Sequence, residues 1–243
     1  MKGGIVLKES VKFRLGLAAP AALIIACLAA LLLAKPIGEY AGQYGSKRGK
    51  EKAAAARPPA VEPVAFKPLE AKDAKAVNAE TPFSAAPNPA AAPFAFSGDN
   101  AARARAADCL TAAVLYEAGN DRIGQQAVAQ VVINRARHPA FPKSICGVVF
   151  QGSERRTGCQ FTFTCDGALA RRYSAAAWGA ARQVASAALS GSVYAPVGLA
   201  THYHTDWVVP YWSDSLEKIT AVGTHLFFRW PGGWGRRPLT GAQ

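Results

Sequence analysis

Several common functional patterns are missing from this sequence of 243 residues. There is no helix-turn-helix, RNP or zinc-finger pattern, which argues against a dedicated nucleic-acid-binding module. No Cys-x-x-Cys pair and no His-Glu-x-x-His string occur, so the familiar signatures of a zinc ribbon and of a zinc protease are absent. No internal repeat is found either, which excludes a solenoid.

Acidic residues are scarce relative to basic ones. The chain has 28 Lys and Arg against 16 Asp and Glu, for a formal net charge of +12. A basic surface can meet nucleic acid, anionic lipid or an anionic wall polymer. Without a nucleic-acid-binding pattern, the membrane and the wall are the favoured partners. A solvated basic face with no partner also accounts for this charge.

Charge is missing altogether from residues 15–34, which are rich in Leu, Ile and Ala. About 20 such residues cross a bilayer as a helix. Basic residues precede the run and favour a cytoplasmic N-terminus, although others follow it. A cleaved signal peptide is the alternative, but its apolar region is usually only about 7–15 residues long. We therefore expect residues 1–14 in the cytoplasm and a retained transmembrane anchor over 15–34.

The remaining chain divides by composition. Half of its 16 prolines fall between Pro58 and Pro93, among Ala, Lys and Glu. Such a segment buries too little apolar surface to offset its ordering entropy, so residues 35–105 are predicted to be a disordered Ala/Pro-rich linker. One folded domain is expected over 106–232, followed by a flexible tail over 233–243.

The most informative stretch is 107–137, where Glu117 continues the inward face of a helical pattern. Leu110, Ala113 and Val114 precede it at three- and four-residue steps. Residues 119–121 break the helix, and a second pattern covers 123–132. A carboxyl group against apolar side chains loses hydration, which favours its neutral, proton-donating form. An ordinary surface Glu near a helix end is the alternative.

Other elements are shorter. Asp108 fits a helix N-cap, and residues 174–189 fit a third helix that stops before Gly191. Strand-like patterns occur at 147–150, 160–164, 200–203 and 226–230. Helices dominate and strands are few, so the predicted fold class is α+β.

Nine short segments, in order, resemble the catalytic domain of the SleB-type cell-wall hydrolase family. They cover about residues 108–230. They are Glu117-Ala118, 124–129, Asn134-Arg135, Phe141-Pro142, 146–150, Gln160-Phe161, 200–204, 210–212 and 223–227.

The resemblance implies a small lysozyme-like or lytic-transglycosylase-like domain that faces the periplasm from a single-pass inner-membrane anchor. It implies that the chain cleaves the MurNAc-GlcNAc glycan strands of peptidoglycan as a lytic transglycosylase, without a cofactor or metal and with Glu117 as the single catalytic carboxyl. Flat aromatic faces and amides suit a sugar polymer, although any of these side chains can instead be core. The candidates for substrate binding are Asn134, Gln160, Phe161, His202, Tyr203 and Trp212.

Three other activities stay open. A glycan hydrolase needs a second carboxylate, and among those of the domain Asp206 is adjacent to another candidate site residue. A zinc amidase could use His202, His204 and His225, because residues two apart on a strand share a face. A wall-binding module without catalysis would use Glu117 only structurally.

Four cysteines lie in the predicted domain, an even set that suggests two disulfides in an oxidising compartment. Four cysteines allow three pairings. Cys159 and Cys165 bracket a short segment, so we expect them to pair locally and leave Cys109 with Cys146. A zinc site is the alternative use of these residues.

Overall fold

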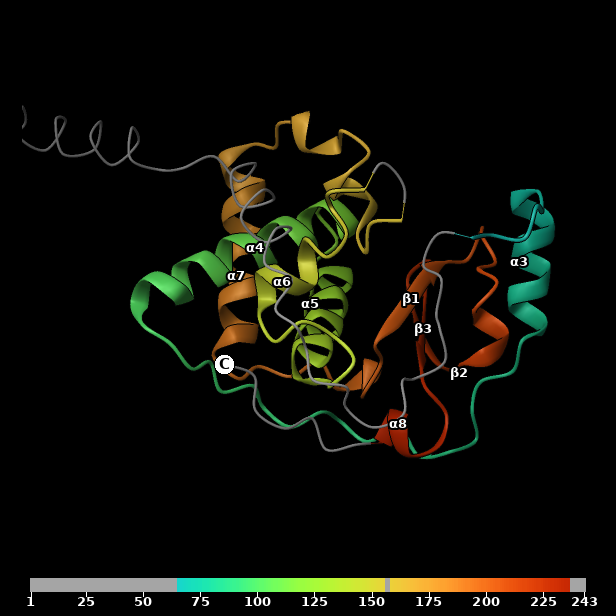
Figure 1. The fold of residues 1–243 in the computed structure, drawn as a ribbon. Helices are drawn as coiled ribbons and strands as arrows, with labels where there is room; N and C mark the ends of the chain where they lie inside the picture. Colours follow the sequence, from blue (N-terminus) through green and yellow to red (C-terminus); the bar gives the residue numbers. More distant parts are fainter. Residues whose placement is uncertain (1–64, 156–157, 237–243) are drawn as a thin grey trace, which may run out of the picture. The chain divides into compact units, whose positions relative to one another are not determined.

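A computed structural model describes residues 65–155 and 158–236 (Figure 1). The predicted anchor at 15–34 and the segment before it lie outside these residues. Within the described part of the chain, no helix is long and apolar enough to span a membrane.

The α-helices are α3 (Ala71–Glu80), α4 (Asn100–Ala118), α5 (Arg122–Arg137), α6 (Ile145–Val149), α7 (Ala175–Leu189) and α8 (Gly232–Arg236). The strands are β1 (His202–Thr205), β2 (Glu217–Val222) and β3 (His225–Arg229), and short 3-10 helices cover Thr162–Thr164, Ala168–Ala170, Ala195–Val197 and Ser213–Ser215. The expected α+β class is confirmed.

Helix α4 is the centre of the helical core. Its residues from Cys109 to Leu115 are almost completely shielded from solvent, as expected for a helix covered on all sides. It packs against α5, α6 and α7. The helix begins at Asn100, with the side chain of Asp99 accepting from the Ala102 N–H at 2.7 Å. The predicted cap at Asp108 is wrong, because Asp108 lies within the helix and forms an ion pair with Arg182 of α7.

Helices α5 and α7 follow their predicted patterns. Asp121 caps α5 by accepting from the Ile123 N–H at 3.0 Å, and the helix continues past the predicted end to Arg137. Ser174 caps α7, accepting from the Ala177 N–H at 3.1 Å. Gly191 then turns the chain with a φ of 97°, a backbone conformation that favours glycine.

The sheet is antiparallel with strand order β1-β3-β2. The side chains of paired residues point to the same face of a sheet. Tyr203 and Phe227 therefore lie on one face, and His204 and Leu226 lie on the other. Strands β1 and β3 were predicted and β2 was not. Two predicted strands are wrong. Residues 147–150 fall largely in α6, whose cap Ser144 accepts from the Gly147 N–H, and residues 160–164 contain a 3-10 turn.

The linker prediction fails for the part of it that is described. Residues 65–99, here called the N-terminal strap, carry α3 and pack beside the sheet (Figure 1). The Asn78 amide donates to the carbonyls of Asp206 and Val208 at 2.7 and 2.9 Å. The buried Lys218 Nζ donates to the carbonyls of Asn78 and Thr81 at 2.6 and 2.9 Å.

A second buried cation fastens the strap further along. Arg229 has no exposed surface, donates from Nε to Glu217 at 2.8 Å and from Nη1 to the Pro87 carbonyl at 2.7 Å. Buried polar groups need partners, so hydrogen bonds from Lys218 and Arg229 hold the first part of the strap to the sheet. This explains why the composition of the strap resembled a linker. Phe94, near the end of the strap, is buried in the helical core.

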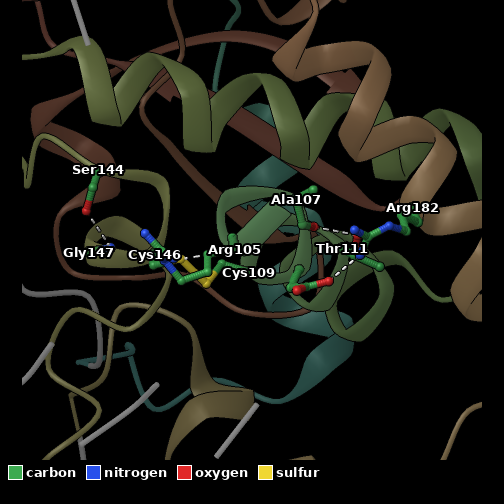
Figure 2. The surroundings of a disulfide bond; sticks show 9 residues. Arg105, Ala107, Cys109, Thr111, Ser144, Cys146, Gly147 and Arg182 are labelled. Carbon is green, nitrogen blue, oxygen red and sulfur yellow. Dashed lines mark hydrogen bonds and ion pairs between the residues drawn. A yellow bond between two sulfur atoms is a disulfide. The ribbon is translucent and has the colours of Figure 1, made fainter. Parts of the chain in front are cut away.

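Both disulfides pair as predicted. Cys109–Cys146 joins α4 to α6 (Figure 2), and Cys159–Cys165 closes a short loop. The predicted flexible tail is wrong at its start, because residues through Arg236 belong to α8, whose Trp234 packs on His138 and Trp230. Residues 237–243 lie outside the described part.

Candidate active site

Glu117 lies in the last turn of α4, just before Gly119 ends the helix with a φ of 53°. Its side chain is half-buried, and Oε2 accepts a hydrogen bond from the Tyr203 hydroxyl at 2.8 Å. Burial raises the pKa of Glu117 and outweighs the Tyr203 hydrogen bond and the charge of Arg135, which both lower it. Asp166 raises this pKa further. The site therefore favours a protonated carboxyl that is ready to donate.

Tyr203 brings the sheet to this carboxyl. It extends from the face of the sheet that also carries Phe227 and His225 of β3, whose rings lie 5.6 and 5.4 Å from that of Tyr203. Burial and the negative charge of Glu117 hold the pKa of Tyr203 well above its usual value. The phenol consequently stays neutral and remains a hydrogen-bond donor to Glu117.

Arg135 supplies a buried positive charge to the same site. It is 3 % exposed, donates from Nε to the Thr201 carbonyl at 2.5 Å, and lies over the rings of Phe141 and Phe161 at 5.3 and 5.4 Å. With its amide oxygen turned inward, Gln160 accepts from both terminal guanidinium nitrogens at 3.0 and 3.2 Å. Burial lowers the pKa of Arg135 to about 10, which leaves it charged at neutral pH.

Residues 159–173, here called the disulfide loop, form one edge of the site. Tyr116, next to Glu117, stacks on Phe163 at 4.9 Å and donates to the Arg171 carbonyl at 2.9 Å. The Cys159–Cys165 disulfide closes its first part. The loop thus carries both Gln160, which holds Arg135, and Asp166, whose charge acts on Glu117.

Three of the six predicted substrate-binding residues lie at this site. Tyr203 contacts Glu117, and Gln160 and Phe161 hold Arg135. Asn134 is different, since it has no exposed surface and donates to the carbonyls of Gly198 and Ala200 at 2.9 and 2.8 Å. It connects α5 to the chain entering β1, so its role is structural.

The prediction also fails for His202 and Trp212, which lie on the opposite face of the sheet. The register places His202 and His204 on the face away from Tyr203, and Trp212 packs against both imidazoles at 5.3 and 5.5 Å. Burial lowers the pKa of His202, and lowers that of His204 to about 4. Buried side chains of this kind cannot line a groove.

The alternative zinc centre is not assembled. His225 pairs with Thr205 and shares the Tyr203 face, so it lies across the sheet from His202 and His204. Among the described residues, no group of three or more His, Cys, Asp and Glu is placed to hold a metal ion. The side-chain hydrogen bond to Glu117 comes from Tyr203 rather than from one of these histidines.

Most other carboxylates are engaged away from Glu117. Asp206, the carboxylate adjacent to another predicted site residue, lies 3.8 Å from Lys75 of the strap. Asp121 caps α5. Four others form ion pairs: Asp108 with Arg182, Glu154 with Arg155, Asp214 with Lys67, and Glu217 with Arg229. Asp166 is the carboxylate whose charge raises the pKa of Glu117.

Sequence reasoning missed two residues of this site. Arg135 entered only as part of the Asn134-Arg135 segment of the family resemblance, and Asp166 was not singled out. Nothing local distinguished Asp166, which is exposed and accepts from the Ala168 N–H.

Comparisons with known proteins found the following similarities. Residues 119–228 match the family model described as Cell Wall Hydrolase, beginning just after Glu117. A spore cortex-lytic enzyme of Halalkalibacterium halodurans is 33% identical over 120 residues, which are 49% of this chain and 33% of that enzyme. The chain therefore matches about a third of that relative's length. The crystal structure of the catalytic domain of the Bacillus cereus SleB protein is 26% identical, with a TM-score of 0.43, and covers 56% of this chain and 95% of that one.

Proposed function

We propose, from the match of residues 119–228 to the cell wall hydrolase family model, that the chain cleaves the glycan strands of peptidoglycan with Glu117 as its acid. The observation that carries the proposal is the half-buried Glu117 carboxyl, whose pKa is raised and which accepts from Tyr203 at 2.8 Å. A carboxyl protonated at higher pH than usual suits a general acid.

In the first step Glu117 donates its proton to the glycosidic oxygen, and the bond from that oxygen to the muramyl C1 breaks. The electrons of the bond leave with the departing sugar hydroxyl, and positive charge develops at C1. Glu117 is now a carboxylate. Its new negative charge is stabilised by the Tyr203 hydrogen bond and by the buried charge of Arg135.

In the second step the Glu117 carboxylate takes the proton from the C6 hydroxyl of the same muramyl residue, whose oxygen bonds to C1. The product is a 1,6-anhydro sugar, and the carboxyl is regenerated without consuming water. One carboxyl is enough for this lytic transglycosylase sequence. We favour it because Asp108, Asp121, Asp206, Asp214 and Glu217 are all engaged with groups other than Glu117.

Hydrolysis is the second candidate, and one observation favours it. Asp166 is exposed on the disulfide loop and its charge raises the pKa of Glu117, and a hydrolase needs a second carboxylate beside the acid. Asp166 replaces Asp206 as the residue to test for this role.

The location is part of the same proposal. Residues 15–34 have the length and composition of a membrane-spanning helix. The proposal therefore includes anchoring in the inner membrane and a catalytic domain in the periplasm, where the two disulfides can persist.

The experiment is digestion of purified sacculi by the full chain and by its Glu117→Gln, Asp166→Asn and Asp206→Asn variants, with products identified by mass spectrometry. Anhydro-muropeptides from all but Glu117→Gln would support transglycosylation. Reducing-end products that require both Glu117 and Asp166 would support hydrolysis. Fragments that survive Glu117→Gln would overturn the assignment.

A further inference from the structure

A cavity of about 210 Å³ lies between α5, α7 and the segment that follows α7. It is separate from the groups that contact Glu117. Gln130 lines the cavity and is itself fixed, since it donates to Asn134 Oδ1 at 3.0 Å and accepts from the Tyr194 N–H at 3.0 Å. One side chain of the lining is therefore held in place by hydrogen bonds.

The polar side chains around this cavity have unused hydrogen-bonding capacity. Arg122, Gln126, Ser192 and Tyr194 line it. Within the described ranges, 65–155 and 158–236, the guanidinium, the amide and the two hydroxyls of these residues have no hydrogen-bond or ion-pair partner in the protein. An arginine offers five N–H donors in a planar fork that matches a carboxylate.

The charge and shape of the lining select one class of ligand. No Asp or Glu lines the cavity, so Arg122 gives it a net positive charge. The carboxylate nearest in sequence, Asp121, is already occupied as the cap of α5. Ala129, Val184 and Ala188 supply an apolar wall. The combination fits a small apolar side chain next to a carboxylate.

The cavity is also within reach of the cleavage site. Arg122 follows Glu117 by five residues, and five extended residues span at most about 18 Å. A bound peptide of five extended residues spans the same distance of about 18 Å. Electrostatic contacts connect the two places, because Asp121 acts both on Tyr194 in the cavity wall and on His225, which packs against Tyr203.

We propose that this cavity binds the acidic stem peptide of the peptidoglycan strand, with Arg122 pairing with a peptide carboxylate. The inference rests on the proposed function and adds peptide recognition to it. The glycan is held at Glu117, and the peptide attached to the muramyl residue extends along the start of α5 to the cavity. The enzyme thereby selects peptide-bearing strands.

The test compares intact sacculi with glycan strands whose peptides have been removed by an amidase. The full chain is assayed beside its Arg122→Ala variant. The control is Arg105→Ala, which removes an exposed arginine of α4, away from the cavity. We expect the wild type to cleave peptide-bearing glycan at least tenfold better. Arg122→Ala should lose at least fivefold in kcat/KM on that substrate and nothing on bare glycan, while Arg105→Ala matches the wild type on both. Equal losses on both substrates, or none on either, would overturn the inference while leaving the cleavage activity established.

A binding measurement separates this inference from the proposed function. The dipeptide L-alanyl-D-glutamate is titrated into the full Glu117→Gln chain, with and without Arg122→Ala, and inorganic phosphate serves as a second probe. Dipeptide binding that depends on Arg122 would support the site even if the wild type cleaved neither substrate. Dipeptide binding that is undetectable, or no tighter than that of phosphate, would overturn it.

Discussion

The hydroxyl of Tyr203 on β1 donates to Oε2 of Glu117 on α4 at 2.8 Å, which connects the sheet to the helical core at the candidate catalytic carboxyl. This bond stabilises the ionised form of Glu117. It also positions the carboxyl before reaction, because the neutral phenol has a single O–H and donates it to Oε2 of Glu117.

The Tyr203→Phe variant removes that hydrogen bond and keeps the ring. A hydrogen bond to a charged group contributes about 1.5–3 kcal/mol, so we expect kcat on sacculi to fall by about 10- to 100-fold. Because the lost bond lowered the pKa of Glu117, this pKa rises further. The acid must be protonated to act, so the alkaline limb of the pH–rate profile should move to higher pH. An unchanged profile would contradict the assigned contact.

Arg135 acts on Glu117 through charge, and its replacement tests that role. Its positive charge lowers the pKa of Glu117, so Arg135→Met should move the alkaline limb to higher pH and reduce kcat. Arg135→Lys keeps the charge but not the planar fork that Gln160 accepts. Arg135→Lys should therefore keep the alkaline limb of the pH–rate profile closer to its wild-type position, while kcat stays below the wild-type value.

Thermal unfolding of both Arg135 variants is the control for this prediction. A merely structural arginine would lower the melting temperature and the rate of either variant without displacing the pH profile. That outcome would remove Arg135 from the catalytic argument and leave it as a brace between α5 and Thr201.

The N-terminal strap should be needed for stability. A chain starting at residue 65 is expected to fold, whereas one starting at residue 100 leaves the buried cations Lys218 and Arg229 without their strap carbonyls. An unsatisfied buried group costs about 1–3 kcal/mol, and more when it is charged. Denaturant unfolding should show the loss. In the longer chain Asn78→Ala should cost about 1–3 kcal/mol, because two buried bonds disappear. Equal stability of the two chains would contradict this account of the strap.

The same residues show how far the sequence could predict this molecule. Helices α4, α5 and α7 follow from local apolar periodicity and caps, and Glu117 follows from its place on one such face. The strap does not, because its order comes from Lys218 and Arg229, which look like surface residues on a strand. His202 and Trp212 resembled groove residues until the register of β1 against β3 placed them on the other face. The face of the sheet on which a side chain lies, and the distant residue that it contacts, depend on tertiary structure and cannot be predicted from local sequence patterns.

The two disulfides should separate stability from activity. Cys109–Cys146 spans 37 residues and Cys159–Cys165 spans 6, for which loop-closure entropy gives about 4 and 2 kcal/mol of stabilisation. The double substitution of Cys109 and Cys146 by Ser should therefore lower the free energy of unfolding more. The double substitution of Cys159 and Cys165 should cost less stability but more activity, because the loop it releases carries Gln160 and Phe161, which hold Arg135, and Asp166.

Both double variants are measured by urea unfolding and by sacculus digestion at a temperature where each remains folded. The comparison is decisive because each pair serves as the matched control of the other. If the Cys159–Cys165 variant kept full activity, the disulfide would not be needed to hold Arg135 and Asp166 in place, and the contacts of Arg135 outside the loop, with the Thr201 carbonyl and the Phe141 ring, would be enough to position its charge.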